Sequence, residues 1–112
     1  MVRNKEFSAV TVAMTSGNTA SFNIPKWAVF AGIFIPAVAD GDLTIGISTD
    51  DSTFHPLLDP SDGADLVVCA SGADAGWVDI SDYIRFISPD MYVRVSSAAG
   101  TATGNFEIRF SG

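Results

Sequence analysis

The sequence has little of the chemistry on which most active sites and covalent crosslinks depend. It contains one cysteine, Cys69, and one histidine, His55, in 112 residues. A single cysteine cannot form an intrachain disulfide or a structural zinc site. A single histidine, with no Gly-x-Ser-x-Gly turn elsewhere in the chain, gives no nucleophile–base arrangement, so a solvated or hydrogen-bonded structural role is expected for it. The sequence therefore predicts a protein that is not an enzyme and that needs no cofactor.

Basic residues are also scarce. Six Lys and Arg stand against thirteen Asp and Glu, which gives a formal net charge of −7. Nucleic acid and anionic membranes both attract basic surfaces, so this charge argues against either as a partner. No apolar run approaches the roughly 18 residues that a membrane-spanning helix needs, and the N-terminus lacks the apolar segment of a signal peptide. We therefore expect a soluble protein that is made in the cytoplasm and is not processed.

Apolar residues and turn formers are plentiful. Hydrophobic residues make up 47% of the chain, and ten Gly and five Pro are spread along it. This content can bury a core, and the length fits one domain. We expect a polar N-terminal arm at residues 1–6 and a single folded domain at residues 7–112.

Short segments of alternating apolar and polar residues run through the whole domain, separated by turns. Period-two alternation favours half-buried strands, and many short strands at even spacing indicate a sandwich or barrel. The sequence predicts an all-β fold: a single antiparallel β-sandwich of jelly-roll type with about eight strands, with an immunoglobulin-like topology as the alternative. The expected strands lie at residues 7–14, 20–24, 28–35, 43–48, 54–58, 66–70, 77–81, 91–95 and 106–110.

Several of these segments carry more specific expectations. Residues 28–35 are apolar at every position, which predicts a central strand covered on both faces, with a short buried helix as the alternative. Gly46 indicates a bulge or the close approach of another group. Residues 54–58 are expected at a sheet edge because Pro56 cannot donate to a ladder. Residues 66–70 are predicted to be a buried strand with Cys69 as a small buried hydrophobe. Residues 81–84 could open a helical turn capped by Ser81 or Asp82.

Two groups of residues could form a binding site. Asp59, Asp62 and Asp65 supply hard oxygen ligands on one loop, which would suit calcium, although aspartates also form such turns without a metal. The tryptophans and tyrosines could form an exposed aromatic platform on which a sugar stacks, although rings at strand ends usually cover the edge of a core. The candidates for that platform are Trp27, Trp77, Tyr83 and Tyr92.

The segment GIFIPAVADGDLTIGISTDDSTFHPLL at residues 32–58 combines an apolar strand ending in proline, a polar loop, an alternating strand, a polar turn and an aromatic-x-x-Leu edge. Together with SPDMYVRV at residues 88–95, it resembles the small β-sandwich virion proteins of tailed bacteriophages. The resemblance implies a capsid decoration (cement) or head-fibre-type protein without catalysis. It implies binding to the major capsid protein on the capsid surface of the virion, after synthesis in the host cytoplasm. It also implies a homo-oligomer, with a trimer favoured.

The N-terminal arm is the predicted docking segment. It carries two of the six basic residues, so it can reach an acidic neighbour. A disordered terminus is the alternative, and the alternative function is a carbohydrate-binding or receptor-binding module of a phage fibre or tail. The predicted partner-binding residues are Val2, Arg3, Asn4, Lys5, Glu6 and Phe7.

Overall fold

The chain is almost entirely β-structure, as the sequence predicts. A computed structural model describes residues 7–37, 41–72 and 74–112. Residues 2–6 of the predicted docking arm lie outside these ranges. The elements of the described residues are β1 (Phe7–Thr15), β2 (Asn18–Thr19), β3 (Phe30–Ile35), β4 (Leu43–Ser48), β5 (His55–Pro56), β6 (Val67–Cys69), β7 (Gly76–Asp79), the 3₁₀ helix η1 (Ser81–Tyr83), β8 (Tyr92–Ser97) and β9 (Gly104–Ser111).

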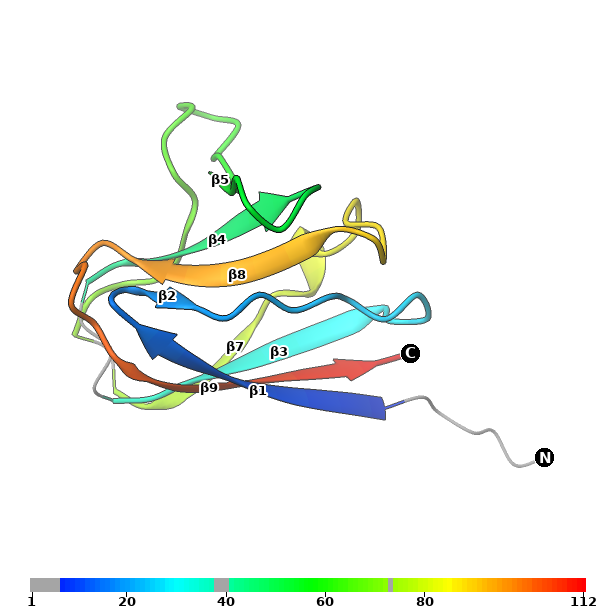
Figure 1. Cartoon of the computed structure of the whole chain (residues 1–112), viewed down its shortest axis with the longest axis horizontal. Helices are drawn as coiled ribbons and strands as arrows, with labels where there is room; N and C mark the ends of the chain where they lie inside the picture. Colours follow the sequence, from blue (N-terminus) through cyan, green and yellow to red (C-terminus); the bar gives the residue numbers. More distant parts are fainter. Residues whose placement is uncertain (1–6, 38–40, 73) are drawn as a thin grey trace.

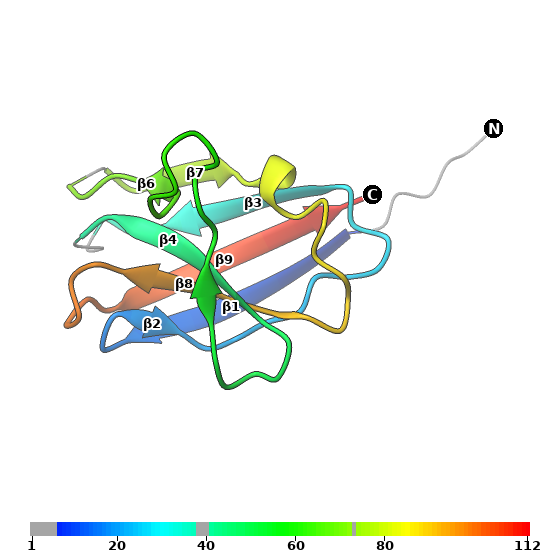
Figure 2. The same cartoon turned by 90° about the horizontal axis from the view of Figure 1, so that it is seen from above.

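The strands form one antiparallel sheet that curls into two facing layers (Figures 1 and 2). The strand order is β5-β4-β8-β2-β1-β9-β3-β7, and β6 pairs with β4. The lower layer in Figure 1 contains β1, β9, β3 and β7, and the upper layer contains β2, β8 and β4. β1 pairs with β9, and β2 pairs with β8. This nested pairing is compatible with a jelly roll, which stays a prediction.

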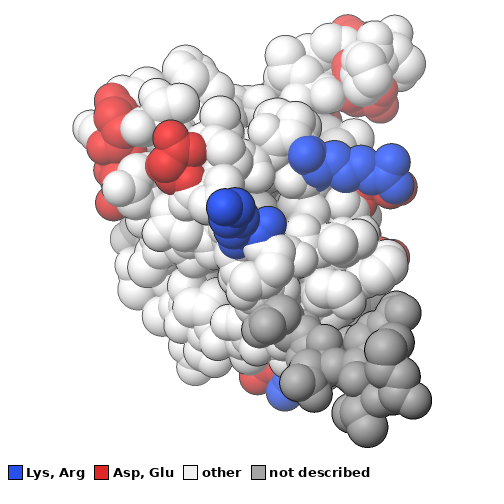
Figure 3. Space-filling model, turned by 90° about the vertical axis from the view of Figure 1, so that its right-hand side faces the viewer, with Lys and Arg blue, Asp and Glu red and all other residues white. Residues whose placement is uncertain are grey.

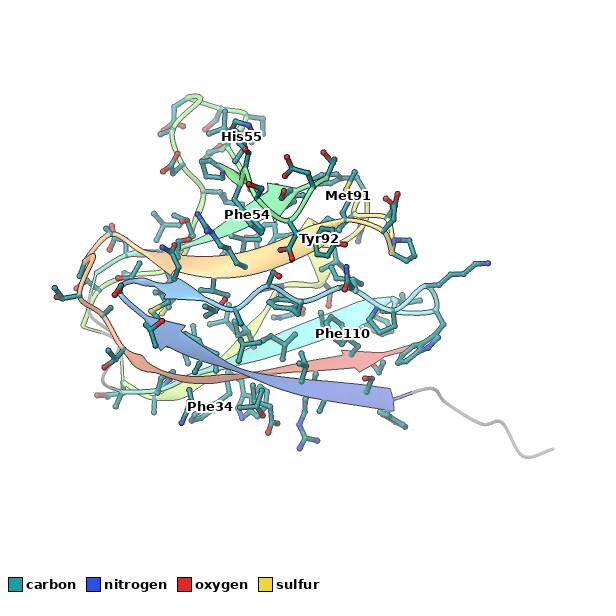
Figure 4. All side chains as sticks on the ribbon, viewed as in Figure 1. Phe34, Phe54, His55, Met91, Tyr92 and Phe110 are labelled. Atoms are coloured by element: carbon teal, nitrogen blue, oxygen red, sulfur yellow. The ribbon has the colours of Figure 1, made fainter. Side chains whose placement is uncertain are left out.

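The core lies between the two layers, where β1, β3, β8 and β9 send alternate side chains inward. Phe106, Ile108 and Phe110 of β9 are buried against the chain's other apolar residues, and Figure 4 shows Phe110 between the layers. The opposite parity of the same strand, Glu107 and Arg109, faces outward. The other buried apolar residues are Val12, Met14, Phe22, Ile24, Ala31, Ile33, Ile35, Leu43, Ile45, Ile80, Ile84, Ile87, Val93, Val95 and Ala102.

The prediction that residues 28–35 are covered on both faces is wrong. The strand begins at Phe30, and only the parity of Ala31, Ile33 and Ile35 is buried. Phe30 is 55% exposed. Antiparallel sheets commonly leave one face in solvent, and in the described residues no helix or further layer covers the outer side of β3. An apolar run can therefore belong to a strand that is covered on one side.

The segment after β1 departs from the predicted strand at residues 20–24. Pairing occurs earlier, at β2, and residues 20–24 contribute only an isolated bridge from Phe22 to Val93. The chain still runs beside β8 here, because the Phe22 N–H donates to the Val93 carbonyl and the Val93 N–H donates to the Phe22 carbonyl, each at 2.8 Å. Phe22 and Ile24 still point into the core, as predicted.

The predicted buried strand at residues 66–70 is present as β6 but is not buried. It pairs only with β4, at the margin of the sheet, so Val67 is largely exposed and Cys69 is half-buried against the core. Cys69 was predicted to be a small buried hydrophobe; it does pack against the core, but it is only partly buried. The predicted edge position of residues 54–58 is confirmed, because β5 ends the strand order.

The predicted helical turn is confirmed as η1, but neither predicted cap is used. Ile80 occupies the N-cap position, and no side chain caps the helix. The Ser81 hydroxyl instead donates to Asp79 Oδ1 at 2.6 Å and accepts from the Ala31 N–H at 3.0 Å. Ser81 thus ties the turn after β7 to β3.

Candidate functional site

Three exposed aromatic rings gather on the outer side of the lower layer. We call this surface the aromatic face and define it by Phe7, Phe30, Trp77, Gly32 and Arg109. Phe7 and Phe30 both pair with the same β9 residue, and Gly32 pairs with Arg109. Phe7 is 71% exposed, and Phe30 and Trp77 are each 55% exposed. Paired residues lie on the same side of a sheet, so the rings share one surface.

The aromatic face is hollowed at its centre because Gly32 has no side chain. A Cβ atom at Gly32 would lie 3.8 Å from Cε3 of Trp77. The hollow has a volume of about 510 Å³, and its lining includes Phe7, Phe30, Trp77 and Arg109. A concave, ring-lined surface on a regular sheet is well suited to hold another molecule.

The indole of Trp77 is held in position by its neighbours. The Phe34 ring meets it edge-on, with 5.4 Å between ring centroids, and the Arg109 guanidinium carbon lies 5.9 Å from the indole centroid. Figure 4 shows Phe34 on the outer side of the lower layer. Edge-to-face rings and cation–π contacts each stabilise one geometry, so this surface is ordered before any partner arrives.

Few charges lie on the aromatic face. Arg109 pairs with Glu107, and Asp79 accepts hydrogen bonds from the hydroxyl and the N–H of Ser81. These hydrogen bonds, of which the one from the hydroxyl has the largest effect, hold the pKa of Asp79 below its usual value. Most of the other acidic residues lie in the loops and turns between strands. The aromatic face is therefore the less acidic part of a strongly acidic chain.

The aromatic face continues toward the end of the sandwich at the start of β3. A second hollow of about 490 Å³ lies there, with Val29, Phe30 and Ile84 in its lining. Val29 and Phe86 are exposed apolar side chains in the two loops at this end. Figure 3, which views this end, shows a largely uncharged surface with separated basic side chains and with acidic side chains toward its margins.

The outer side of the upper layer carries a different kind of hollow. Residues 49–66 rise above β4 and β8, as Figure 1 shows, and we call the hollow beneath them the overhang pocket. Its volume is about 390 Å³. Its lining residues are Asp42, Thr44, Gly46, Phe54, Pro56, Asp65, Val67, Arg94, Ser96, Ser97 and Ala98.

Gly46 is the floor of the overhang pocket. A Cβ atom at Gly46 would lie 3.5 Å from Cβ of Phe54 and 3.7 Å from Cγ of Arg94. The predicted close approach at this glycine is therefore confirmed. Phe54, labelled in Figure 4, lies with its ring centroid 4.3 Å from the Arg94 guanidinium carbon. His55, the next residue, is exposed on β5.

The aspartates that could bind calcium serve as turn formers in their own loop. Asp59 Oδ1 accepts from the N–H and the hydroxyl of Ser61, and Asp62 Oδ1 accepts from the Ala64 N–H. The bonds from Ser61 lower the pKa of Asp59. Nowhere in the described ranges do three or more His, Cys, Asp or Glu side chains gather as metal ligands.

The sequence identified part of the aromatic face and misread the rest. Phe7, the last of the predicted partner-binding residues, lines this face, and its role in binding stays a prediction. Packing on the core was expected for both tryptophans; it holds for Trp27 and is wrong for Trp77. Phe30 was missed because its strand was expected to be covered on both sides. The clue in the sequence was the position of Phe30, which alternation places on the face of the strand opposite to Ala31 and Ile33.

Comparison with models of known protein families found no match, and neither did comparison with curated proteins. Among the described residues, no helix is long and apolar enough to cross a membrane. The two outer surfaces of the sandwich are therefore the candidate binding sites among the described residues.

Proposed function

We propose that this chain is a non-enzymatic structural protein of a virion, which binds and stabilises a capsid lattice as a decoration (cement) protein. The observation that carries this function is the aromatic face, with Phe7, Phe30 and Trp77 exposed around a hollow. Exposed apolar patches on soluble domains mark interaction surfaces, and aromatic residues and Arg are enriched in protein–protein interfaces. The resemblance of residues 32–58 to phage virion proteins points to the major capsid protein as the partner.

Copies of the chain act together in this function. We infer a homo-oligomer, most simply a trimer, that presents several aromatic faces to the lattice. Linked copies gain affinity without any new contact, because each further binding event becomes intramolecular. An oligomer that binds several lattice positions at once is therefore held more tightly than a single chain.

Co-sedimentation with undecorated capsids tests this function. We expect the wild-type protein to pellet with the particles, and Trp77→Ser and Phe30→Ser each to lower the bound fraction at least about tenfold, the loss typical of a central aromatic contact. Leu58→Ser is the matched control, because Leu58 is 53% exposed but lies on the overhang. The control should bind as the wild type does. Failure of the wild type to bind at micromolar concentration would reject the function.

The arm is tested separately by deleting residues 1–6, which removes Val2, Arg3, Asn4, Lys5 and Glu6. These residues directly precede Phe7, a residue of the aromatic face, in the sequence. We expect the deletion to abolish capsid binding and to leave the thermal unfolding midpoint unchanged, since the core lies in residues 7–112. Unchanged binding would restrict docking to the aromatic face itself.

A carbohydrate-binding or receptor-binding module is the second candidate function. The exposed indole of Trp77, beside the guanidinium of Arg109, favours it, because aromatic rings stack on sugar rings. A glycan array separates the two candidates. Binding to the array that Trp77→Ser abolishes, without binding to capsids, would favour the second candidate.

A further inference from the structure

The overhang pocket contains a basic side chain whose hydrogen-bonding groups are unused. Arg94 Nε is buried and has no hydrogen-bond partner among the described residues. Neither ion pair of those residues involves Arg94. A buried donor without a partner costs free energy, and buried polar groups in native proteins are almost always paired. Because Nε itself is enclosed, the donors open to a molecule in the pocket are the terminal N–H groups of the guanidinium, which also form no hydrogen bond with the described residues.

Arg94 is held in one position. Its stem runs over Gly46, and its guanidinium stacks on the Phe54 ring. The overhang that carries Phe54 is itself anchored to β4, because the Leu57 N–H donates to the Ile45 carbonyl at 2.9 Å. The pocket is therefore formed in advance, which lowers the entropic cost of binding.

Acceptor groups line the same pocket. Asp42 is fixed by the Ser71 N–H, which donates to its Oδ1 at 2.9 Å. Asp65 also lines the pocket, and its carboxylate takes part in no hydrogen bond that the described residues form. The pocket thus combines a group that can only donate, the guanidinium, with groups that can only accept, the carboxylates.

We propose that the overhang pocket binds a neutral saccharide unit. A hydroxyl group can accept from Arg94 and donate to Asp65 at the same time, so a polyhydroxylated ring satisfies both kinds of group. An anion is disfavoured by the two carboxylates, and a cation is disfavoured by Arg94. A volume of about 390 Å³ is within the range of small-molecule sites, and Pro56 and Val67 give the ring apolar walls. This site lies on the layer opposite the aromatic face and does not depend on capsid binding.

Amide NMR titration of the full chain tests the site. The probes are glucose, galactose, mannose, N-acetylglucosamine and disaccharides built from them, each added to millimolar concentration. We expect at least one probe to shift the amide signals of Thr44, Gly46 and Ser96, and to leave that of Gly32 unmoved. Arg94→Lys should weaken that binding at least about tenfold, because it removes a charge-assisted hydrogen bond. Arg109→Lys, a matched change on the other layer, should not alter it.

Four results would overturn the site, three of which concern the probes and Arg94 and the last of which concerns the aromatic face. The first is the absence of any shift with all neutral probes, which would leave only water in the pocket. The second is equal affinity in the wild type and Arg94→Lys. The third is stronger binding of an anionic sugar or of a lysine-rich peptide than of any neutral probe. If Arg94→Lys fails to fold, Asp65→Asn serves in its place, since Asp65 is exposed and its loss leaves the core intact. Shifts confined to Gly32 and Trp77 would instead assign sugar binding to the aromatic face and also overturn the site.

Discussion

The two layers of the sandwich have the same inner surface and different outer surfaces. Both send alternate apolar residues into one core. Outside, the lower layer leaves the rings of Phe7, Phe30 and Trp77 uncovered, whereas residues 49–66 fold over the upper layer and enclose Arg94 with Phe54. Alternation therefore decides which residues face the core. Whether the opposite face of a strand is covered or exposed depends on where the following segment of the chain runs.

The outer surfaces also differ in scale, and this suits them to different partners. The aromatic face is broad, weakly charged and built on β1, β9, β3 and β7. The overhang pocket is smaller, and a guanidinium and two carboxylates are among its lining groups. A broad apolar surface favours a macromolecule, and a small pocket with a few polar groups favours a small ligand.

The largest expected effect comes from breaking the core that both layers share. Phe106 is fully buried, and we expect Phe106→Ala to lower the free energy of unfolding by about 3–5 kcal/mol through lost burial and a cavity. Phe30→Ala, on the outer side of the same layer, should change it by less than about 0.5 kcal/mol. Urea denaturation measures both. Equal losses would show that the aromatic face is part of the folding core.

A smaller effect distinguishes two glycines that share a left-handed backbone. Gly41 has φ +81° and Gly72 has φ +80°. A Cβ at Gly41 would lie 2.5 Å from the Ala99 backbone nitrogen, whereas one at Gly72 would meet nothing within 4 Å. We expect Gly72→Ala to cost about 1–2 kcal/mol, and Gly41→Ala about 2–4 kcal/mol because a backbone clash adds to the strain. Thermal unfolding compares them, and a larger loss for Gly72→Ala would contradict the packing at Gly41.

The smallest effect concerns the turn that opens the overhang. Asp50 Oδ1 accepts from the N–H groups of Thr53 and Ser52 and from the Ser48 hydroxyl. These bonds, with that of Thr53 the strongest, lower the pKa of Asp50 from 3.8 to about 2. Because the pKa is lower in the folded state than in the unfolded state, the ionised carboxylate stabilises the fold at pH values above 3.8. This stabilisation is lost as the pH falls from 3.8 to about 2.

Carboxyl NMR titration and acid unfolding check the effect at Asp50. The carboxyl carbon should titrate with a midpoint near the lowered pKa. Asp50→Ala should lose part of the dependence of stability on pH in that window, whereas a variant of an aspartate outside this turn, Asp74→Ala, should keep it. An unshifted midpoint would mean that the turn does not hold the overhang in solution.

The fold was more predictable from the sequence than the site. The alternation of apolar and polar residues predicted which residues of β9 and β8 point into the core, because every second side chain of these strands is buried. The side of β3 that faces outward could not be predicted in this way, since Phe30 and Phe34 are as apolar as their buried neighbours. Gly46 did indicate a close approach, but its partner, Phe54, is set by the path of the overhang. Arg94 has no unusual sequence context, and only the fold encloses it.

Radical footprinting measures directly which outer surface of the sandwich meets the capsid. Exposed apolar side chains serve as probes on both layers: Phe7, Phe30 and Trp77 on the aromatic face, and Leu58 and Val67 on the upper layer. On addition of undecorated capsids, we expect oxidation of the aromatic-face probes to fall while that of the upper-layer probes is unchanged. Protection of Leu58 and Val67, with the three rings still oxidised, would contradict docking through the aromatic face.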